Sequence, residues 1–183
     1  MLKPTKEEIL AAYDKAVPEV IGPGLRVLFC GINPSLYSAA VGHHFARPGN
    51  RFWPTLHASG STPRRLSPFE DRELIGLGYG VTNIVGRATA TAAELSPGEL
   101  VKGGKKLEAK VRRYAPRYVA VLGISAYRSA FDRPGAALGP QEERLGGARL
   151  WILPNPSGLN AHYQLRDLAE LFGELRRVAE QSL

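Results

Sequence analysis

Two asparagines, each followed by proline and serine, are the residues of this sequence best suited to carry chemistry. Asn33 ends the apolar run LRVLFCGI, in the order GINPS, and Asn155 follows the apolar run RLWIL, in the order NPSGL. An amide side chain has no proton to titrate at ordinary pH, but it donates and accepts hydrogen bonds. The two motifs therefore indicate the positioning of a water molecule or a polar ligand, without general-base catalysis.

The prolines indicate where these two asparagines stand. A residue before proline is driven toward extended geometry, and the proline itself cannot donate a hydrogen bond to a sheet. Each asparagine is therefore expected at the exit of a strand. In a parallel sheet both exits lie on the edge where ligands bind. Asn-Pro is also a common turn dipeptide, and the pattern alone leaves that second interpretation open.

Four apolar, β-branched runs predict the strands that would position these residues. They span residues 25–32, 80–85, 118–124 and 149–153, and three of them lack polar alternation, as strands buried on both faces do. Capping patterns and apolar periodicity predict helices at residues 5–16, 67–77, 96–114, 125–131 and 164–180. The alternation predicts an α/β fold: a three-layer αβα arrangement with a central, mostly parallel sheet of four to five strands, as a single domain over residues 1–183. Residues 34–50 show no clear period and directly follow the first strand, which favours a functional loop.

The composition narrows the class of protein. The chain has 183 residues, 44% of them hydrophobic, and a formal net charge of +7, with Lys and Arg clusters that favour a polyanionic partner. A single cysteine, Cys30, excludes a disulfide framework and any cysteine-built zinc or iron–sulfur site, and its apolar surroundings predict a buried side chain. The N-terminal MLKPTKEEIL lacks the apolar stretch of a signal peptide, and no run is long enough to cross a membrane. We therefore expect a cytoplasmic protein.

Three motifs in this order resemble the mismatch-specific uracil-DNA glycosylases, the family that includes the bacterial double-strand uracil glycosylases and the thymine-DNA glycosylases. GINPS is similar to the family's Gly-Ile-Asn-Pro-Gly, FARPGNRFW to its FAHPANRFW-type stretch, and NPSGL matches its second motif in full. The likeness extends over roughly residues 20–180 and includes the intervening GVTNIV. It implies a DNA repair enzyme that hydrolyses the N-glycosidic bond of uracil opposite guanine in double-stranded DNA and leaves an abasic site. Thymine and other modified pyrimidines are further candidate substrates, and the resemblance implies a monomer that needs no cofactor and no metal.

The resemblance also assigns roles around the flipped base. Asn33 would orient the attacking water, and backbone N–H groups in the segments of Ile32 and Phe45 would stabilise the departing uracil. The side chain of Phe45 would stack on the base, with an ordinary core phenylalanine as the alternative interpretation. The substrate-binding residues implied are Gly31, Ile32, Ser35, Ser38 and Phe45.

On the DNA side, the resemblance makes Leu159 the wedge that enters the vacated base stack. The backbone of Gly158 and Asn160 would meet the guanine that has lost its partner. The DNA-binding residues implied are Asn155, Ser157, Gly158, Leu159 and Asn160.

Two positions depart from the family pattern. Ser35 stands where the family commonly has glycine, and its small side chain predicts that uracil enters more readily than thymine, whose extra methyl group is worth only about 1–3 kcal/mol of discrimination. Ala93 stands before Glu94, where bacterial relatives tend to have a polar residue. This departure and the neutral Asn33 both predict slow turnover, with Glu94 either compensating or simply placing charge at a helix start.

Several alternatives stay open at the level of the sequence. His43 and His44 are candidates for a metal pair, for the lining of a pocket mouth, or for a plain surface. Gly103 and Gly104 interrupt a basic helix without a phosphate-loop pattern, which favours a structural role. The chain is alternatively a broad uracil-DNA glycosylase that also acts on single strands, or a mismatch-binding DNA module without catalysis.

Overall fold

The strands form because short β-branched and apolar runs alternate their side chains between two buried faces. In β1, Val27 and Phe29 join one hydrophobic cluster, whereas Leu28 and Cys30 join another on the opposite side of the sheet. The computed structural model describes residues 3–181. Its strands are β1 (Val27–Gly31), β2 (Tyr79–Asn83), β3 (Tyr118–Leu122), β4 (Gly139–Leu145) and β5 (Ala148–Leu153).

The five strands make one sheet in the order β2-β1-β3-β5-β4. The pairs β1–β2, β1–β3 and β3–β5 are parallel, and only β4 pairs antiparallel, with β5. This confirms the predicted α/β class and the mostly parallel sheet. The carboxyl ends of four strands therefore open onto a single edge.

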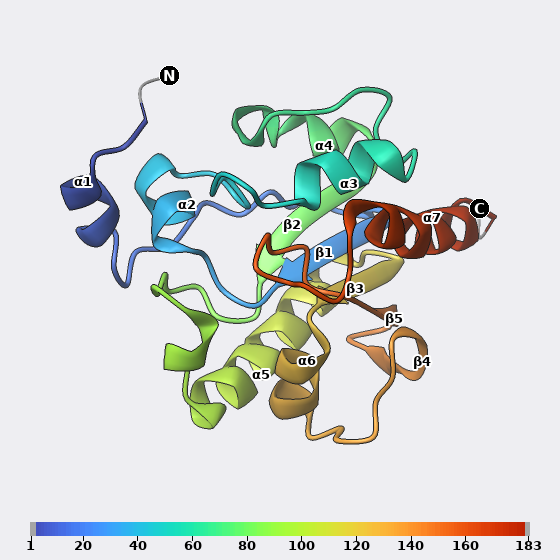
Figure 1. Cartoon of the computed structure of the whole chain (residues 1–183). Helices are drawn as coiled ribbons and strands as arrows, with labels where there is room; N and C mark the ends of the chain where they lie inside the picture. The colour runs from blue at the N-terminus through green and yellow to red at the C-terminus, as the bar shows by residue number, and fades with distance from the viewer. Residues whose placement is uncertain (1–2, 182–183) are drawn as a thin grey trace.

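Helices cover both faces of the sheet (Figure 1). On one face α3, α4 and α7 pack with the cluster of Phe29, and on the other α5 and α6 pack with the cluster of Cys30. The helices are α1 (Lys6–Leu10), α2 (Leu36–Val41), α3 (Phe52–Ala58), α4 (Glu73–Gly76), α5 (Pro97–Tyr114), α6 (Ile124–Phe131) and α7 (Leu165–Gln181), with short 3₁₀ turns η1 (Pro68–Glu70) and η2 (Ala92–Glu94).

Two predicted helices are wrong in extent. The helix predicted over residues 5–16 ends at Leu10, because the chain turns away and Asp14, at φ 63°, donates its backbone N–H to the carbonyl oxygen of Ala88. The helix predicted over residues 67–77 is divided into η1 and α4, since backbone bonds such as Leu74 N–H to Asp71 O keep the tighter 3₁₀ spacing.

The sequence patterns also miss three elements. α2 lies inside residues 34–50, where no regular structure was expected, and begins at the N-cap Ser35. α3 begins at Phe52, near the end of the FARPGNRFW segment, and extends beyond it to Ala58. β4 escapes prediction because it is the edge strand, in which exposed charged residues alternate with half-buried ones over GPQEERL.

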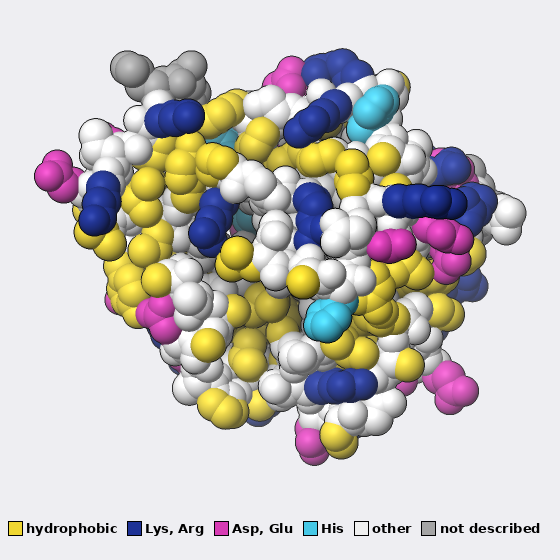
Figure 2. All heavy atoms as spheres, in the orientation of Figure 1, with side chains coloured by type: hydrophobic (Ala, Val, Ile, Leu, Met, Phe, Trp, Pro, Cys, Tyr) yellow, Lys and Arg dark blue, Asp and Glu magenta, His cyan; other side chains and the backbone are white. Residues whose placement is uncertain are grey.

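Charged side chains are unevenly distributed on the surface. Figure 2 shows Lys and Arg spread over one face, including its centre, whereas Asp and Glu lie mostly toward its outline. Several arginines are neutralised in ion pairs, including Arg64 with Glu70 and Glu73, and Arg133 with Glu143. These pairs fit solvated surfaces better than a phosphate-binding surface.

Candidate active site

A cavity of about 390 Å³ lies where the parallel strands end. Gly31 at the end of β1, Asn83 at the end of β2 and Leu122 at the end of β3 all line it. Asn33 and Asn155 line the same cavity, so the two Asn-Pro motifs meet at one edge of the sheet as the sequence predicts. Ile32, Ser35, Ser38, Phe45, Ser157 and Leu159 line it as well.

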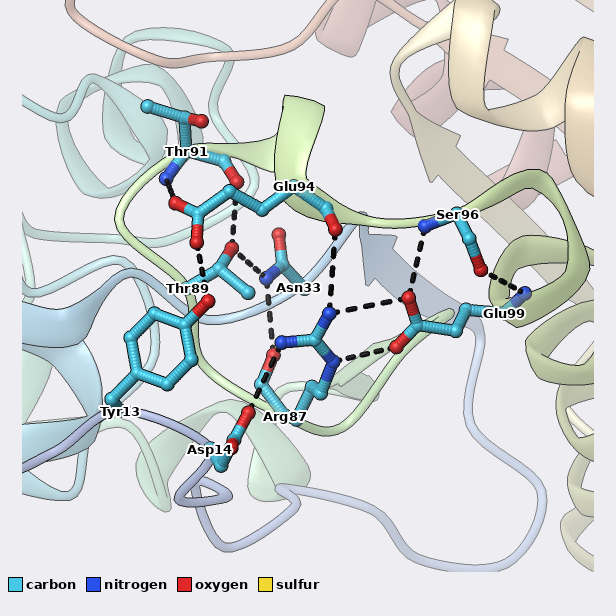
Figure 3. Close-up of polar contacts among 9 residues, drawn as sticks. All are labelled: Tyr13, Asp14, Asn33, Arg87, Thr89, Thr91, Glu94, Ser96 and Glu99. Atoms are coloured by element: carbon cyan, nitrogen blue, oxygen red, sulfur yellow. Dashed lines mark hydrogen bonds and ion pairs between the residues drawn. The ribbon is translucent and has the colours of Figure 1, made fainter.

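The hydrogen bonds of Asn33 fix which end of its amide faces the cavity (Figure 3). The amino group donates to the carbonyl oxygen of Arg87 at 3.0 Å and to Thr89 Oγ1 at 2.7 Å. Thr89 Oγ1 must be the acceptor in the second bond, because its own proton goes to the carbonyl oxygen of Thr91 at 2.7 Å. Both amino hydrogens of Asn33 are therefore used, and its carbonyl oxygen Oδ1 is left as an acceptor beside the cavity.

An ion-pair network holds the segment that orients Asn33 (Figure 3). The Arg87 guanidinium contacts both carboxylate oxygens of Glu99, at 2.5 and 3.2 Å, and Asp14 at 3.0 Å. Because of its hydrogen bond to Arg87, Glu99 has its pKa lowered to about 2. The network ties the segment after β2 to the first turn of α5, where Ser96 and Glu99 form a capping box.

Glu94 acts at the start of η2. Its carboxylate accepts from the Thr91 backbone N–H at 2.8 Å and from the Tyr13 hydroxyl at 2.5 Å. These bonds place it outside the cavity lining, to which Thr91 and Ala92 contribute instead. The structure therefore supports the helix-start interpretation of Glu94, and the side chain of Ala93 is not part of the cavity wall.

Phe45 forms one wall of the cavity in a strained backbone conformation. Its φ is 53°, a left-handed value that costs a non-glycine residue about 1–3 kcal/mol. The ring stacks on Phe52 of α3 with centroids 4.2 Å apart, and it packs against the hydrophobic core. Phe45 is thus both a core-supported side chain and a cavity wall, so the two interpretations of this residue are compatible.

Position 31 requires glycine because the Asn83 and Phe45 side chains approach its backbone closely. A Cβ at this position would lie 2.6 Å from Asn83 Oδ1 and 3.2 Å from the Phe45 ring. A side chain would therefore fill the space between the cavity's amide and its aromatic wall.

Ser35 and Ser38 hold the Phe45 segment. Ser35 Oγ accepts from the Ser38 N–H and donates to Ser38 Oγ, both at 3.1 Å. Ser38 Oγ in turn accepts from the backbone N–H of Ala46 at 3.0 Å. The serine at position 35 therefore also caps α2, a role that a glycine side chain cannot fill.

Asn83 and His44 line the cavity although the sequence patterns did not single out Asn83. His44 is 3% exposed, and burial lowers its pKa, so the ring is neutral at pH 7. Its Nε2 lies 3.0 Å from the Pro18 carbonyl oxygen and must donate there, which makes Nδ1 an acceptor for the Asn83 amino group at 3.4 Å. The position of Asn83 at the end of a buried strand, like Asn33, was the available signal.

His43 does not share the environment of its neighbour. Its Nδ1 lies 2.9 Å from the buried carboxylate of Asp71, and its ring packs edge-on against Phe69. His43 is half-buried and paired with Asp71. His44 is buried, so the plain-surface interpretation is wrong for that residue. Within residues 3–181 no group of three or more His, Cys, Asp or Glu side chains is arranged to hold a metal ion.

The NPSGL segment forms a tight turn beside the cavity. Asn155 Oδ1 accepts from the Ser157 N–H at 2.9 Å, so this amide stabilises its own turn, unlike that of Asn33. Leu159 is 76% exposed at the end of the turn. The Asn160 backbone N–H bonds to Ser157 O and its carbonyl accepts from Arg51, so the backbone of Asn160 is already occupied on both sides.

The fold and this cavity define an α/β protein with an amide-lined pocket at the carboxyl edge of its sheet. The sequence profile of the uracil DNA glycosylase superfamily matches residues 18–176, and the chain belongs to that superfamily of DNA-directed hydrolases of N-glycosyl bonds. A uracil DNA glycosylase candidate from Methanosarcina acetivorans, solved by NMR in solution, has a similar fold. The TM-score is 0.57 and the identity 16%, over 89% of this chain and 98% of the other. In the described part of the chain, no helix has the length and apolar character needed to cross a membrane.

Proposed function

We propose that this protein excises uracil opposite guanine from double-stranded DNA by hydrolysis. It acts as a monomer whose whole chain forms one domain. The observation that carries the proposal is the amide of Asn33, whose two amino hydrogens are bonded to Arg87 O and Thr89 Oγ1. The carbonyl oxygen that remains is a fixed acceptor at the cavity, suited to orient a water molecule.

The chemistry follows from that acceptor. A water held by Asn33 Oδ1 attacks the anomeric carbon of the deoxyribose as the bond to the base nitrogen breaks, and the electron pair leaves with uracil. The water oxygen stays on the sugar, and its proton passes to solvent or to the uracil anion. Because an amide cannot take up that proton, general-base assistance, worth about 10²- to 10⁴-fold, is lost and turnover is slow.

The cavity also has groups that suit a pyrimidine. The Phe45 ring offers a stacking face, supported from behind by Phe52. With its amino group directed at His44, Asn83 keeps Oδ1 as an acceptor beside Gly31, complementary to the N3–H donor of uracil. The cavity volume of about 390 Å³ leaves room for a single base and water.

Leu159 supports a substrate in the duplex. A 76% exposed leucine beside the cavity is suited to fill the gap that a flipped nucleotide leaves. Flipping costs less from a G·U mismatch than from a matched pair, which favours uracil opposite guanine. The backbone of Gly158 is then the better candidate to meet the guanine, since that of Asn160 is already bonded.

The test is excision from labelled DNA carrying G·U, A·U or G·T pairs, or uracil in a single strand, followed by alkali. We expect strand breaks mainly at G·U. Equal cleavage of all uracil substrates would instead indicate a broad uracil glycosylase, and tight binding without breaks a mismatch-binding module.

Asn33→Ala should abolish cleavage while duplex binding, measured by fluorescence anisotropy, stays within about twofold, because the side chain acts on the water and not on the DNA. Retained cleavage would show that another group positions the nucleophile.

A further inference from the structure

Arg51 connects the start of α3 to the segment that carries Leu159, here called the 155–163 loop (residues 155–163). Its guanidinium donates to three backbone carbonyl oxygens of that loop: Tyr163 at 2.5 Å, Ser157 at 2.6 Å and Asn160 at 2.7 Å. The Arg51 backbone N–H adds a bond to the carbonyl oxygen of Pro156 at 2.9 Å. One residue thus holds most of the loop's length.

The side chain of Arg51 does not serve its own helix, although its backbone carbonyl accepts from the Thr55 N–H at 2.9 Å. Arg51 is the N-cap residue of α3, yet its side chain makes no capping bond to that helix. The guanidinium Nε is buried and has no hydrogen-bond partner. The side chain therefore reaches the loop at the cost of leaving one donor unsatisfied. A cation surrounded by carbonyl dipoles is a rigid arrangement, since its removal would leave three partly buried acceptors without this partner.

The loop contacts the segment before α3 at a second point. A Cβ on Gly158 would lie 2.4 Å from the Gly49 carbonyl oxygen, so the two backbones are in direct contact. Phe52, the residue after Arg51, supports the Phe45 ring. The loop with Leu159 and the stacking wall are therefore fixed to the same short stretch of chain, at residues 49–52.

We infer that Arg51 is the positioning residue of the 155–163 loop. By fixing this loop, it fixes the position from which the Leu159 side chain inserts into the duplex. This inference rests on the proposed function. Arg51 does not touch the base or the water; it acts through Leu159. Without it the loop keeps its own turn bonds, such as Ser157 N–H to Asn155 Oδ1, but loses its attachment to α3.

The experiment is a double-mutant cycle on a G·U duplex, with Arg51→Met, Leu159→Ala and the double variant compared under single-turnover conditions. We expect each single substitution to slow excision by about tenfold to a hundredfold, the scale of an approximately 1 Å displacement. Because Arg51 acts through Leu159, Arg51→Met should cost less than about threefold in the Leu159→Ala background. Arg51→Lys, which keeps the charge but cannot reach three carbonyls, should fall between the wild type and Arg51→Met.

Arg176→Met is the matched control. Arg176 also donates to a backbone carbonyl oxygen, that of Ser59 at 3.0 Å, but Ser59 lies at the C-terminal end of α3, away from the loop. Its substitution should lower thermal stability to a similar degree and leave the excision rate unchanged.

Two further readouts separate the outcomes. In Arg51→Met, base flipping reported by 2-aminopurine beside the uracil should decrease, and backbone amides of the 155–163 loop should exchange hydrogen faster. Fully additive rates in the cycle, or unchanged exchange in the loop, would overturn the inference.

If the wild type excises no uracil, the proposed function fails. Faster hydrogen exchange of the loop amides in Arg51→Met would then still support the anchoring of the loop by Arg51.

Discussion

At the scale of single residues, the property that matters is the polarity of a short chain of hydrogen bonds. Thr91 O accepts from Thr89, Thr89 accepts from Asn33, and Asn33 is left with an unpaired acceptor beside the cavity. An amide that was free to rotate would present its amino group half of the time, and that group cannot accept a hydrogen bond from water. Thr89 is therefore a positioning residue for Asn33.

Thr89→Val tests this polarity with a side chain of the same shape. The substitution removes one of the two acceptors for the Asn33 amino group, so we expect the single-turnover rate to fall about tenfold while the Kd for duplex stays the same. Thr62→Val is the control, because Thr62 is equally buried and bonds to Arg64 O away from the cavity. An equal loss of rate in the control would indicate a general effect on stability.

At the scale of elements, α5 sets the position of the β2 exit by close contact. A Cβ on Gly103 would lie 2.3 Å from the Ile84 carbonyl oxygen, and one on Gly104 would lie 2.9 Å from the Ala130 carbonyl oxygen. These contacts support the structural role expected for the glycine pair. Ile84 directly follows Asn83, so the helix packs against the segment that delivers a cavity residue.

Gly103→Ala should therefore destabilise the protein despite the higher helix propensity of alanine. Overpacking costs about 1–3 kcal/mol, which outweighs the gain of about 1 kcal/mol from propensity. Gly98→Ala, in the first turn of the same helix, meets nothing nearer than Ser96 Oγ at 3.9 Å and should be neutral or stabilising. Urea denaturation of both variants measures the difference, and a stabilised Gly103→Ala would contradict the close contact.

The link between α5 and the Arg87 segment predicts a pH-dependent stability. The pKa of Glu99 is lowered from 4.5 to about 2 in the folded state by Arg87, so its contribution is present above about pH 4.5 and is lost as the pH falls toward 2. Glu99→Gln should be less stable than the wild type at pH 7, and the difference should shrink as the pH falls from about 4.5 to about 2. Glu174→Gln, on an exposed part of α7, removes the same charge away from Arg87 and is the control for the change in net charge.

At the scale of the whole molecule, the net charge is +7, and the residues that line the cavity include a single Lys or Arg side chain, that of Arg47. Arg47 lines the cavity and forms no ion pair with any residue from 3 to 181, in contrast to the paired Arg64 and Arg133. The positive side chains on the face in Figure 2 fit a polyanion that approaches from one side. On the proposed function, we expect Arg47 to meet a phosphate next to the flipped nucleotide.

Arg47→Gln should weaken duplex binding and reduce the slope of log K against log salt concentration by about 0.9, the value for one lost phosphate contact. Arg133→Gln, between α6 and β4, removes an equal charge outside the cavity and should leave the slope unchanged. Binding titrations at several salt concentrations give both slopes. Equal effects of the two substitutions would mean that only net charge matters.

The sequence by itself determined the fold class and the edge of the sheet at which the candidate site lies. Buried parallel strands are continuous apolar runs, and the prolines after Asn33 and Asn155 mark where two of them end. The start of α5 could be predicted because its capping box, formed by Ser96 and Glu99, lies within four neighbouring residues of the sequence. The edge strand β4 and the short helix α3 were missed because their local patterns are weak and tertiary packing stabilises them.

Only the tertiary structure decided how the cavity residues are oriented. The amide of Asn33 is directed by Arg87 and Thr89, the acceptor of Asn83 is set by the neutral His44, and the 155–163 loop is held by Arg51. Each of these partners lies far along the chain from the group that it orients. The direction of a hydrogen bond depends on both partners, and a sequence pattern specifies only one of them.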